Sequence, residues 1–252
     1  DGLVLYLPFS EGMTSSSAST AYDRSPYGND GTATNMPMPG RNATSGESGW
    51  ATTTAKCKVP GCMSFDGVND YVSVADSNSL NSFADKITVM MWMNSVATLP
   101  KNQQLIDRGG TGYIYFGTDS GANRLRVDLG GDSATWLYST SNLISTGVWA
   151  YVGFVYDGAT ITFYIDGKSA GSVASTGNIG ALSGILSIGY GGTLGYFNGL
   201  VDEVRVYNRA LSADEVRTHY LRGTGAGGAV VADKFRIIGT DNNVDFIVNS
   251  GD

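Results

Sequence analysis

The sequence predicts an all-β fold with one short helix near its C-terminal end. Glycine accounts for 35 of the 252 residues, and only 15% of the residues are charged, which is typical of short strands joined by tight turns. Many short segments alternate apolar with polar residues, which is the period of a strand with one buried face. Since all-β cores of this length commonly form one unit, we expect one large domain rather than two.

The alternation places strands along most of the chain. Residues 87–94 are apolar on both faces and should lie in the middle of a sheet. Two Asp-Gly turns, at 157–158 and 166–167, separate the strands of a β-meander. Residues 32–62 lack periodicity and are expected to form a long loop. Further strands are expected at 3–9, 63–66, 71–74, 113–116, 124–129, 136–138 and 182–190.

Residues 199–211 predict one more strand, which carries an acidic pair, Asp202 and Glu203. Directly after it, Ser212 and Glu215 have the spacing of a capping box, so a short helix should follow. We therefore place the main domain at 1–222 and a Gly-rich linker at 223–228. Residues 229–252 are expected to form a β-hairpin that docks on this domain or begins a further module.

Charge and hydropathy exclude several classes of function. The formal net charge of −7 disfavours nucleic-acid binding, which needs clustered Lys and Arg to displace counterions from phosphates. It also disfavours anionic membranes, and no apolar run is long enough to insert into a bilayer. The sequence starts at Asp1 without a visible signal peptide, so we interpret it as an excised or mature fragment of a larger multidomain chain.

Cys57 and Cys62 are the only cysteines, and a Pro-Gly pair lies between them. Too few cysteines and histidines are present to complete a zinc site, so a small structural disulfide is favoured over two free thiols. Closing so short a loop stabilises a fold by about 2 kcal/mol in the chain-entropy model. A disulfide also implies an oxidising, extracytoplasmic setting.

Three successive predicted strands place aliphatic side chains and Phe116 on one face and aromatic or charged side chains on the other. If these strands pair, the second face is a polar sheet surface that carries flat rings. Sugars bind by stacking on aromatic rings and by hydrogen bonding to planar side chains. The alternative is that loops bury several of the rings. The candidate ligand-binding residues are Tyr113, Tyr115, Arg126, Asp128, Trp136 and Tyr138.

Residues 22–31 concentrate oxygen-bearing side chains in a segment whose Pro and Gly residues force tight turns. Calcium prefers several oxygens that converge from such a loop, although the spacing is not that of an EF-hand. An ordinary Asx-rich turn is the alternative interpretation of the same residues.

The ordered segments resemble a known family, the laminin-G-like, concanavalin A-like jelly-roll domains of secreted lectins, glycosidase accessory modules and surface proteins. The resemblance covers about residues 2–222. It implies two antiparallel sheets packed face to face, with the first and last strands adjacent. Family members often hold a structural calcium ion, which the resemblance assigns here to Asp23, Ser25, Asn29 and Asp202. The matching segments are Leu5-Tyr6-Leu7-Pro8-Phe9, Asp23 to Gly31, Ser64 to Val72, Ile87-Thr88-Val89 with Trp92, Phe163 to Gly167, and Phe197 to Ser212.

Enzymes on this scaffold use a Glu-x-Asp-x-x-Glu arrangement, which the sequence lacks. The single histidine, His219, falls in the predicted helix and is expected to be a surface or packing residue. We therefore expect no enzyme. The leading hypothesis is a calcium-stabilised carbohydrate-binding or adhesion module of a secreted, cell-surface or virion protein, with a glycan or glycoprotein as partner. A structural or protein-interaction domain of the same fold is the alternative, and a glycoside hydrolase is the third.

Overall fold

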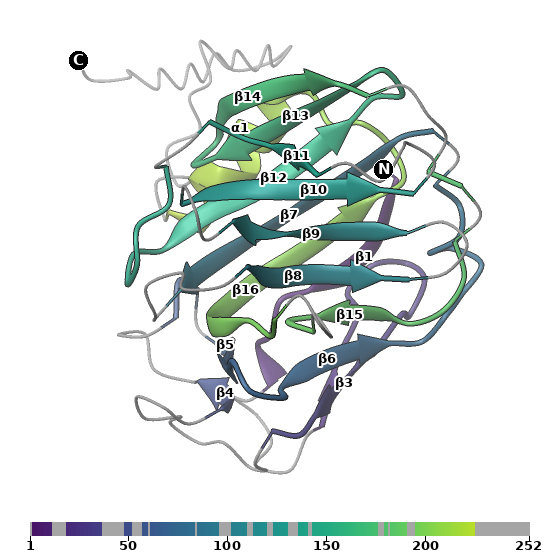
Figure 1. Ribbon diagram of the computed structural model, residues 1–252. Helices are drawn as coiled ribbons and strands as arrows, with labels where there is room; N and C mark the ends of the chain where they lie inside the picture. The colour runs from purple at the N-terminus through teal and green to yellow at the C-terminus, as the bar shows by residue number, and fades with distance from the viewer. Residues whose placement is uncertain are drawn as a thin grey trace, which may run out of the picture.

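The alternating segments form two antiparallel β-sheets that pack face to face, and the predicted sandwich with one short helix is confirmed in the computed structural model (Figure 1). None of the described helical residues belongs to a segment long and apolar enough to cross a bilayer. The structure describes residues 2–11, 19–36, 48–51, 57–59, 61–83, 85–95, 102–109, 113–119, 123–130, 136–140, 143–175, 179–180, 182–190 and 195–224.

Each sheet has eight strands. The first sheet has, in spatial order, β14 (Lys168–Ala174), β13 (Thr160–Ile165), β12 (Ala150–Tyr156), β7 (Ile87–Ser95), β16 (Asn198–Tyr207), β5 (Cys62–Asp66) and β4 (Gly49–Ala51), and β1 (Leu3–Leu7) also pairs with β16. The second sheet has, in order, β11 (Leu137–Tyr138), β10 (Arg124–Leu129), β9 (Ile114–Asp119), β8 (Gln103–Arg108), β15 (Leu186–Ile188), β6 (Tyr71–Val74), β3 (Gly31–Thr34) and β2 (Thr20–Ala21).

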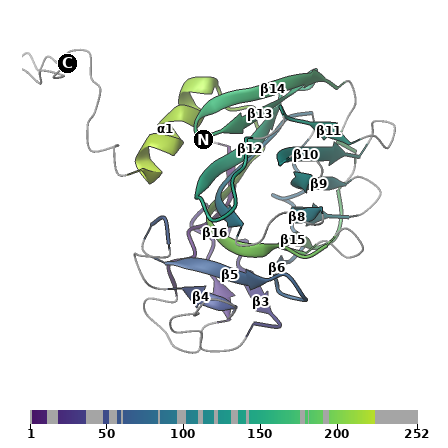
Figure 2. The same cartoon turned by 60° about the vertical axis from the view of Figure 1, so that its left-hand side comes forward.

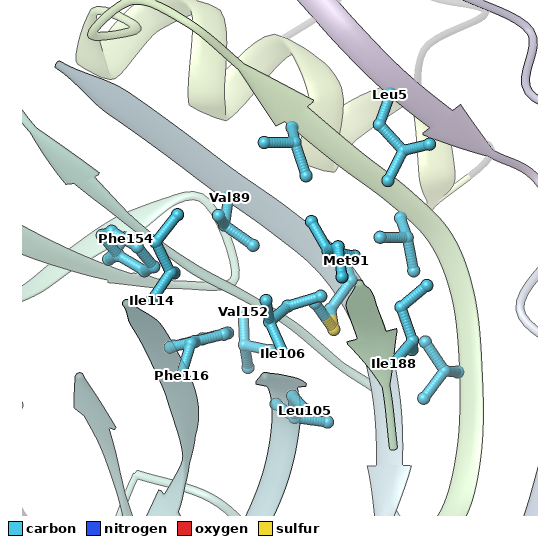
Figure 3. Close-up of a cluster of buried hydrophobic side chains, with 14 of the residues drawn as sticks. Leu5, Val89, Met91, Leu105, Ile106, Ile114, Phe116, Val152, Phe154 and Ile188 are labelled. Atoms are coloured by element: carbon cyan, nitrogen blue, oxygen red, sulfur yellow. The ribbon is translucent and has the colours of Figure 1, made fainter. Parts of the chain in front are cut away.

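The hydrophobic core lies between the two sheets. Phe154 of the first sheet and Phe116 of the second meet across it, with ring centroids 5.3 Å apart. Figure 3 shows these rings among aliphatic side chains from both layers, including Val89, Met91 and Ile106. All of these residues are buried, so the alternation of each strand is explained by one face that turns toward this core.

β7 lies between β12 and β16, and all nine of its residues are buried. One face of β7 points into the core. The other face, with Met90 and Trp92, packs in a second cluster that includes Val216 of the helix. The prediction of a central strand is confirmed, because a strand covered on both faces must be apolar on both.

The helix α1 (Ala213–Gly223) covers the outside of the first sheet (Figure 2). The predicted capping box is present, since the Ser212 hydroxyl accepts from the Glu215 amide and the Glu215 carboxylate accepts from the Ser212 amide. Gly223 packs so closely on Trp92 that a Cβ atom there would lie 2.3 Å from the indole nitrogen. The helix thus closes the second cluster from outside.

Other predicted features are also confirmed. Cys57 and Cys62 form a disulfide. The meander β12–β13–β14 turns at Asp166 and Gly167, whose φ angles of 50° and 73° are both left-handed, as a two-residue hairpin turn requires. β1 pairs with β16, which places the first and last strands side by side as the family resemblance implied.

Three expectations about segments need correction. The segment 32–62 is not only loop, because it contains most of β3 and all of β4, which pair with β6 and β5. The strand expected at 182–190 is confined to β15. The helix ends at Gly223, inside the expected linker. The strands β3, β4 and β15 contain only three or four residues each, too few for the alternation to define their bounds. The rest of that linker and the hairpin expected at 229–252 lie outside the described residues.

Candidate functional site

The second sheet has a polar face that is turned away from the first sheet, and we call it the outer face. On β9, Ile114 and Phe116 point into the core, so Tyr115 between them points outward. The strand register places Tyr115 opposite Asp128 on one side and opposite Asp107 on the other. Pairing continues through β15 and β6. The resulting outer row consists of Asp128, Tyr115, Asp107, Ser187 and Ser73.

Planar groups stack beside this row. The rings of Tyr113 and Tyr115 lie 4.8 Å apart and are tilted by only 18°, and Trp136 continues the stack at 6.2 Å from Tyr115. The Arg126 guanidinium carbon lies 3.9 Å from the Trp136 ring centroid, a cation–π distance. These four side chains, which we call the planar stack, remain partly exposed except for Arg126. Within the described residues, these three rings are therefore only partly covered.

Arg126 and Asp128 are the covered members of the predicted set, with 2% and 8% of their surfaces exposed. The Arg126 guanidinium donates to the Gln104 side chain at 3.4 Å. Burial lowers the pKa of Arg126, although the group stays cationic at neutral pH. Since a ring and an amide hold the guanidinium in place, its planar donors are positioned before any ligand arrives.

Tyr138, the sixth predicted residue, lies on β11 opposite Arg126. Its ring lies 3.9 Å from the guanidinium carbon of Arg124, which also forms an ion pair of 2.8 Å with Asp119. The structure thus brings all six predicted residues together on one face. It adds Arg124, Asp119 and Gln104, which the sequence analysis did not select.

Asp107 is the most informative residue that the sequence analysis missed. It is flanked by Tyr115 and Ser187 on the outer face, and burial raises the pKa of its carboxyl to about 6. Within the described part of the chain, its carboxylate accepts no hydrogen bond. The register shifts between Gln104 and Ile106, so simple alternation along β8 could not have identified which face Asp107 occupies.

A second group of rings lies farther along the outer face. Tyr71 shares that face with Ser73, because Val72 and Val74 point into the core. Tyr190 meets Tyr71 at 5.2 Å and 64°, and Tyr196 meets Tyr190 at 5.4 Å and 89°. We call these three residues the tyrosine cluster. Edge-to-face packing differs from the planar stack, because one ring of each such pair meets its partner through an edge and keeps its faces clear of that partner.

The residues predicted to bind calcium are placed in two different environments. In the first, Asp23 accepts four hydrogen bonds. One oxygen accepts from the amides of Tyr6 and Ser25, and the other from the amide of Asn29 and the hydroxyl of Ser25. A carboxylate has about four lone-pair sites, so this one is saturated by its own loop together with the Tyr6 amide of β1. The amide group of Asn29 is similarly engaged, and donates to Val4 at 2.7 Å and to Ser79 at 2.9 Å.

Asp202 lies on the outside of the first sheet and has no exposed surface. One carboxylate oxygen accepts from the Val59 amide in the disulfide loop at 3.0 Å, and the other has no hydrogen-bond partner among the described residues. Burial is the main cause that raises the pKa of Asp202 to about 8. It therefore anchors the disulfide loop and is mostly protonated at neutral pH.

These placements do not fit a calcium ion held jointly by Asp23 and Asp202. Asp23 has no oxygen lone pair left, and Asp202 contacts Val59 rather than the early loop. Among the residues that the structure describes, no three His, Cys, Asp or Glu side chains gather into a metal site. The Asx-rich turn, the alternative interpretation, describes the placement of Asp23, and calcium binding stays a prediction.

The acidic pair lies at a β-bulge rather than in the regular strand that the alternation predicted. Glu203 has a φ angle of 56°, and the pairing of β16 with β7 shifts register between Asp202 and Arg205. The Glu203 carboxylate forms an ion pair with Arg205 and accepts from the Tyr6 hydroxyl at 2.9 Å. This network links β16 to β1, so Glu203 has a structural role.

His219 is a packing residue, as expected. Its ring nitrogen lies 3.0 Å from the Tyr207 hydroxyl. Burial, with nearby Arg205, lowers the pKa of His219 to about 4, so the imidazole is neutral at physiological pH. No carboxylate or serine contact of His219 that would form a triad is present among the described residues.

A family comparison identifies the fold family of the chain. The model of the family described as Concanavalin A-like lectin/glucanases superfamily matches residues 66–217, which is more than half of the sequence. The chain belongs to this superfamily. The match begins after β1 and the Asp23 turn, yet β1 is part of the same sheet as the matched strands. Because the superfamily includes lectins and glucanases, membership alone does not separate binding from hydrolysis.

Solved structures share this concanavalin A-like fold. Domain 4 of the extracellular GH43 arabinanase AbnA from Geobacillus stearothermophilus, in complex with arabinotriose, matches 85% of this chain and 96% of that domain, with 19% identity and a TM-score of 0.61. The binding domain of Paraclostridial Mosquitocidal Protein 1 matches with 15% identity and a TM-score of 0.63. Trypanosoma rangeli sialidase, in complex with the inhibitor DANA, matches with 18% identity and a TM-score of 0.58.

The coverage differs among these neighbours. The matched region is 88% of this chain in both of the latter cases, but only 52% of the binding-domain chain and 33% of the sialidase chain. At identities below one fifth, these similarities show a shared fold. The ligands and activities in their names describe those proteins.

Proposed function

We propose that this concanavalin A-like domain binds carbohydrate and holds it on the outer face of the second sheet. The observation that carries the proposal is the planar stack beside the outer row, in which three partly exposed rings lie next to the fixed guanidinium of Arg126. Sugars combine apolar C–H faces with hydroxyl groups, so they fit surfaces that combine rings with planar donors and acceptors. The arabinotriose complex of a domain with this fold adds support.

The members of the stack have different tasks. Tyr115 is its middle ring, so it mainly fixes the positions of Tyr113 and Trp136. Those two rings then supply apolar surface at the ends of the stack. Arg126 donates hydrogen bonds, and Asp128 accepts them. A surface ordered in this way loses little conformational entropy when a ligand binds.

We further propose that the domain works in adhesion as part of a secreted, cell-surface or virion protein. The Cys57–Cys62 disulfide supports an oxidising setting. Other domains of the larger chain would then supply its other activities. In the sialidase and in the binding domain of the mosquitocidal protein, the matched region is likewise only part of the chain.

Trp136→Ala is expected to weaken glycan binding by about 30-fold or more, which is the effect of removing an aromatic hot spot of about 2 kcal/mol. A glycan array identifies the ligand, and titration calorimetry then compares the variant with the wild type. Tyr27→Ala is the matched control, because Tyr27 is a 53% exposed ring outside the planar stack and the tyrosine cluster. If the folded wild-type domain binds no glycan on the array, it is instead a structural or protein-interaction domain.

One observation favours hydrolysis as a second candidate. Asp107 and Asp128 flank Tyr115 from neighbouring strands, so their backbones are about 10 Å apart, and the raised pKa of Asp107 suits a general acid. Release of reducing ends from the glycan that binds, abolished in Asp107→Asn, would establish this activity. Binding without any release supports the carbohydrate-binding proposal.

A structural calcium ion is a separate proposal, and it rests on the family resemblance. If calcium stabilises this domain, a chelator is expected to lower its melting temperature and added calcium to restore it. Differential scanning calorimetry in chelator and in calcium makes the measurement. Equal melting temperatures would mean that Asp23 acts only through the hydrogen bonds described above.

A further inference from the structure

Two ring clusters occupy separate parts of the outer face. The planar stack includes Tyr115 on β9, and the tyrosine cluster includes Tyr71 on β6. The strands between them are β8 and β15, so three strand spacings separate the clusters. At about 4.8 Å for each spacing, the separation is about 14 Å, which exceeds the size of a single sugar ring.

Short polar side chains lie between the clusters. Asp107, Ser187 and Ser73 follow one another across β8, β15 and β6 in the outer row. None of them carries a ring, and Ser187 is buried, so the groups that lie partly exposed between the two clusters are the Asp107 carboxyl and the Ser73 hydroxyl. An extended ligand that contacted both clusters would pass over these groups.

The charge in the middle of the outer row is negative. Asp107 and Asp128 are its ionisable carboxyls. Burial raises the pKa of Tyr115, and these two carboxylates raise it further. Arg124 is paired with Asp119, and Arg126 is engaged by Trp136 and Gln104. Asp107 accepts no hydrogen bond from the described residues, so a ligand hydroxyl would supply the donor that it lacks. A carboxylate on the ligand would be repelled at the same place.

We propose that the outer face binds a chain of neutral sugars laid across the strands, with Tyr113, Tyr115 and Trp136 at one end, Tyr71, Tyr190 and Tyr196 at the other, and Asp107 accepting sugar hydroxyls between them. This inference rests on the proposed carbohydrate-binding function and names its ligand class. The ring faces left open by edge-to-face packing in the tyrosine cluster suit stacking of a second sugar unit.

The test uses neutral xylo-, cello- and arabino-oligosaccharides from the monosaccharide to the hexasaccharide, with calorimetric titration. Affinity is expected to rise with chain length until both clusters are in contact. Tyr190→Ala should then lower the affinity for the hexasaccharide about tenfold and make the affinity depend less on chain length. Tyr190→Phe, which keeps the ring, should retain most of the affinity. Equal affinity for short and long chains, or no effect of Tyr190→Ala, would overturn the extended site.

Asp107→Asn tests the middle of the site. It is expected to weaken oligosaccharide binding about tenfold, because hydrogen bonds to a charged acceptor are the stronger ones. It should not lower the melting temperature at neutral pH, since burial disfavours the charged carboxylate in the folded protein. Unchanged affinity would remove Asp107 from the site.

Lactose and sialyllactose test the ligand class as a matched pair. Lactose, the neutral member, is expected to bind more tightly, and stronger binding of sialyllactose would overturn the neutral class. The proposed function fails separately. It fails if no sugar binds at all. If binding does not depend on chain length but is abolished by Trp136→Ala, the proposed function holds and only the extended site is rejected.

Discussion

Asp202→Asn is expected to remove most of the loss of stability that the wild-type domain suffers as the pH rises. Asp202 has no exposed surface, and burial raises the pKa of its carboxyl from 3.8 to about 8. The folded state therefore holds a proton that the unfolded state releases near pH 4. This contribution is complete below the unfolded pKa and is lost as the pH rises through the folded pKa. Between pH 5 and pH 9, the wild type is expected to lose on the order of 3–5 kcal/mol of unfolding free energy through this group.

Urea unfolding at pH 5 and pH 9 measures this effect as the difference between the wild type and the variant. Asn keeps an acceptor for the Val59 amide. It has the shape and neutrality of the protonated carboxyl but cannot ionise as the pH rises. Asp157→Asn is the control, because Asp157 is an exposed turn residue whose pKa is lowered by hydrogen bonds from the amides of Ala159 and Thr160. If wild type and Asp202→Asn lose the same stability between the two pH values, Asp202 is ionised in the folded protein.

Asp23→Ala is expected to lower the unfolding free energy by about 2–4 kcal/mol. Its carboxylate accepts from Tyr6, Ser25 and Asn29, and two of these residues belong to the turn itself. Removal of a charged acceptor leaves partly buried amides without a partner, and each such loss costs about 1–3 kcal/mol. The Tyr6 amide belongs to β1, so the turn would also lose its attachment to the first sheet.

Asp30→Ala is the matched control for Asp23→Ala. Asp30 is exposed and accepts one described hydrogen bond, from the Asp23 amide at 2.8 Å. We expect a loss below about 1 kcal/mol for this variant. Urea unfolding in chelator and in calcium separates the two interpretations of Asp23. A loss that is equal in both supports the hydrogen-bonded turn, whereas a loss seen only with calcium supports a metal ligand.

Alternation in the sequence was enough to predict much of the fold. It identified β7 as central because both faces of that strand are apolar, and it placed Tyr115, Arg126 and Asp128 on one face because their neighbours are aliphatic. The short strands β3 and β4, of four and three residues, were missed because so few residues display no clear period. Pairing with a longer neighbour creates these strands, and pairing is not visible in a local pattern.

The parts of the candidate site that were missed depend on distant contacts. Asp107 follows an irregular pairing in β8. Tyr190 contacts Tyr71, which is more than one hundred residues away in the sequence, and Tyr196 contacts Tyr190. The calcium prediction shows a different limit. A segment rich in side-chain oxygens does not reveal whether those oxygens accept hydrogen bonds from nearby backbone amides, as in Asp23, or are free to bind a cation.

The adjacency of β1 and β16 has a consequence for synthesis of the chain. Leu3 faces Tyr207, so β1 cannot pair with β16 during synthesis until about two hundred further residues have followed it. At 5–20 residues per second, this delay is on the order of tens of seconds. Once β7 has emerged, it lacks β16 on one side until residues 198–207 follow, although all of its residues are buried in the folded domain. We infer that the nascent domain needs protection against aggregation until β16 emerges.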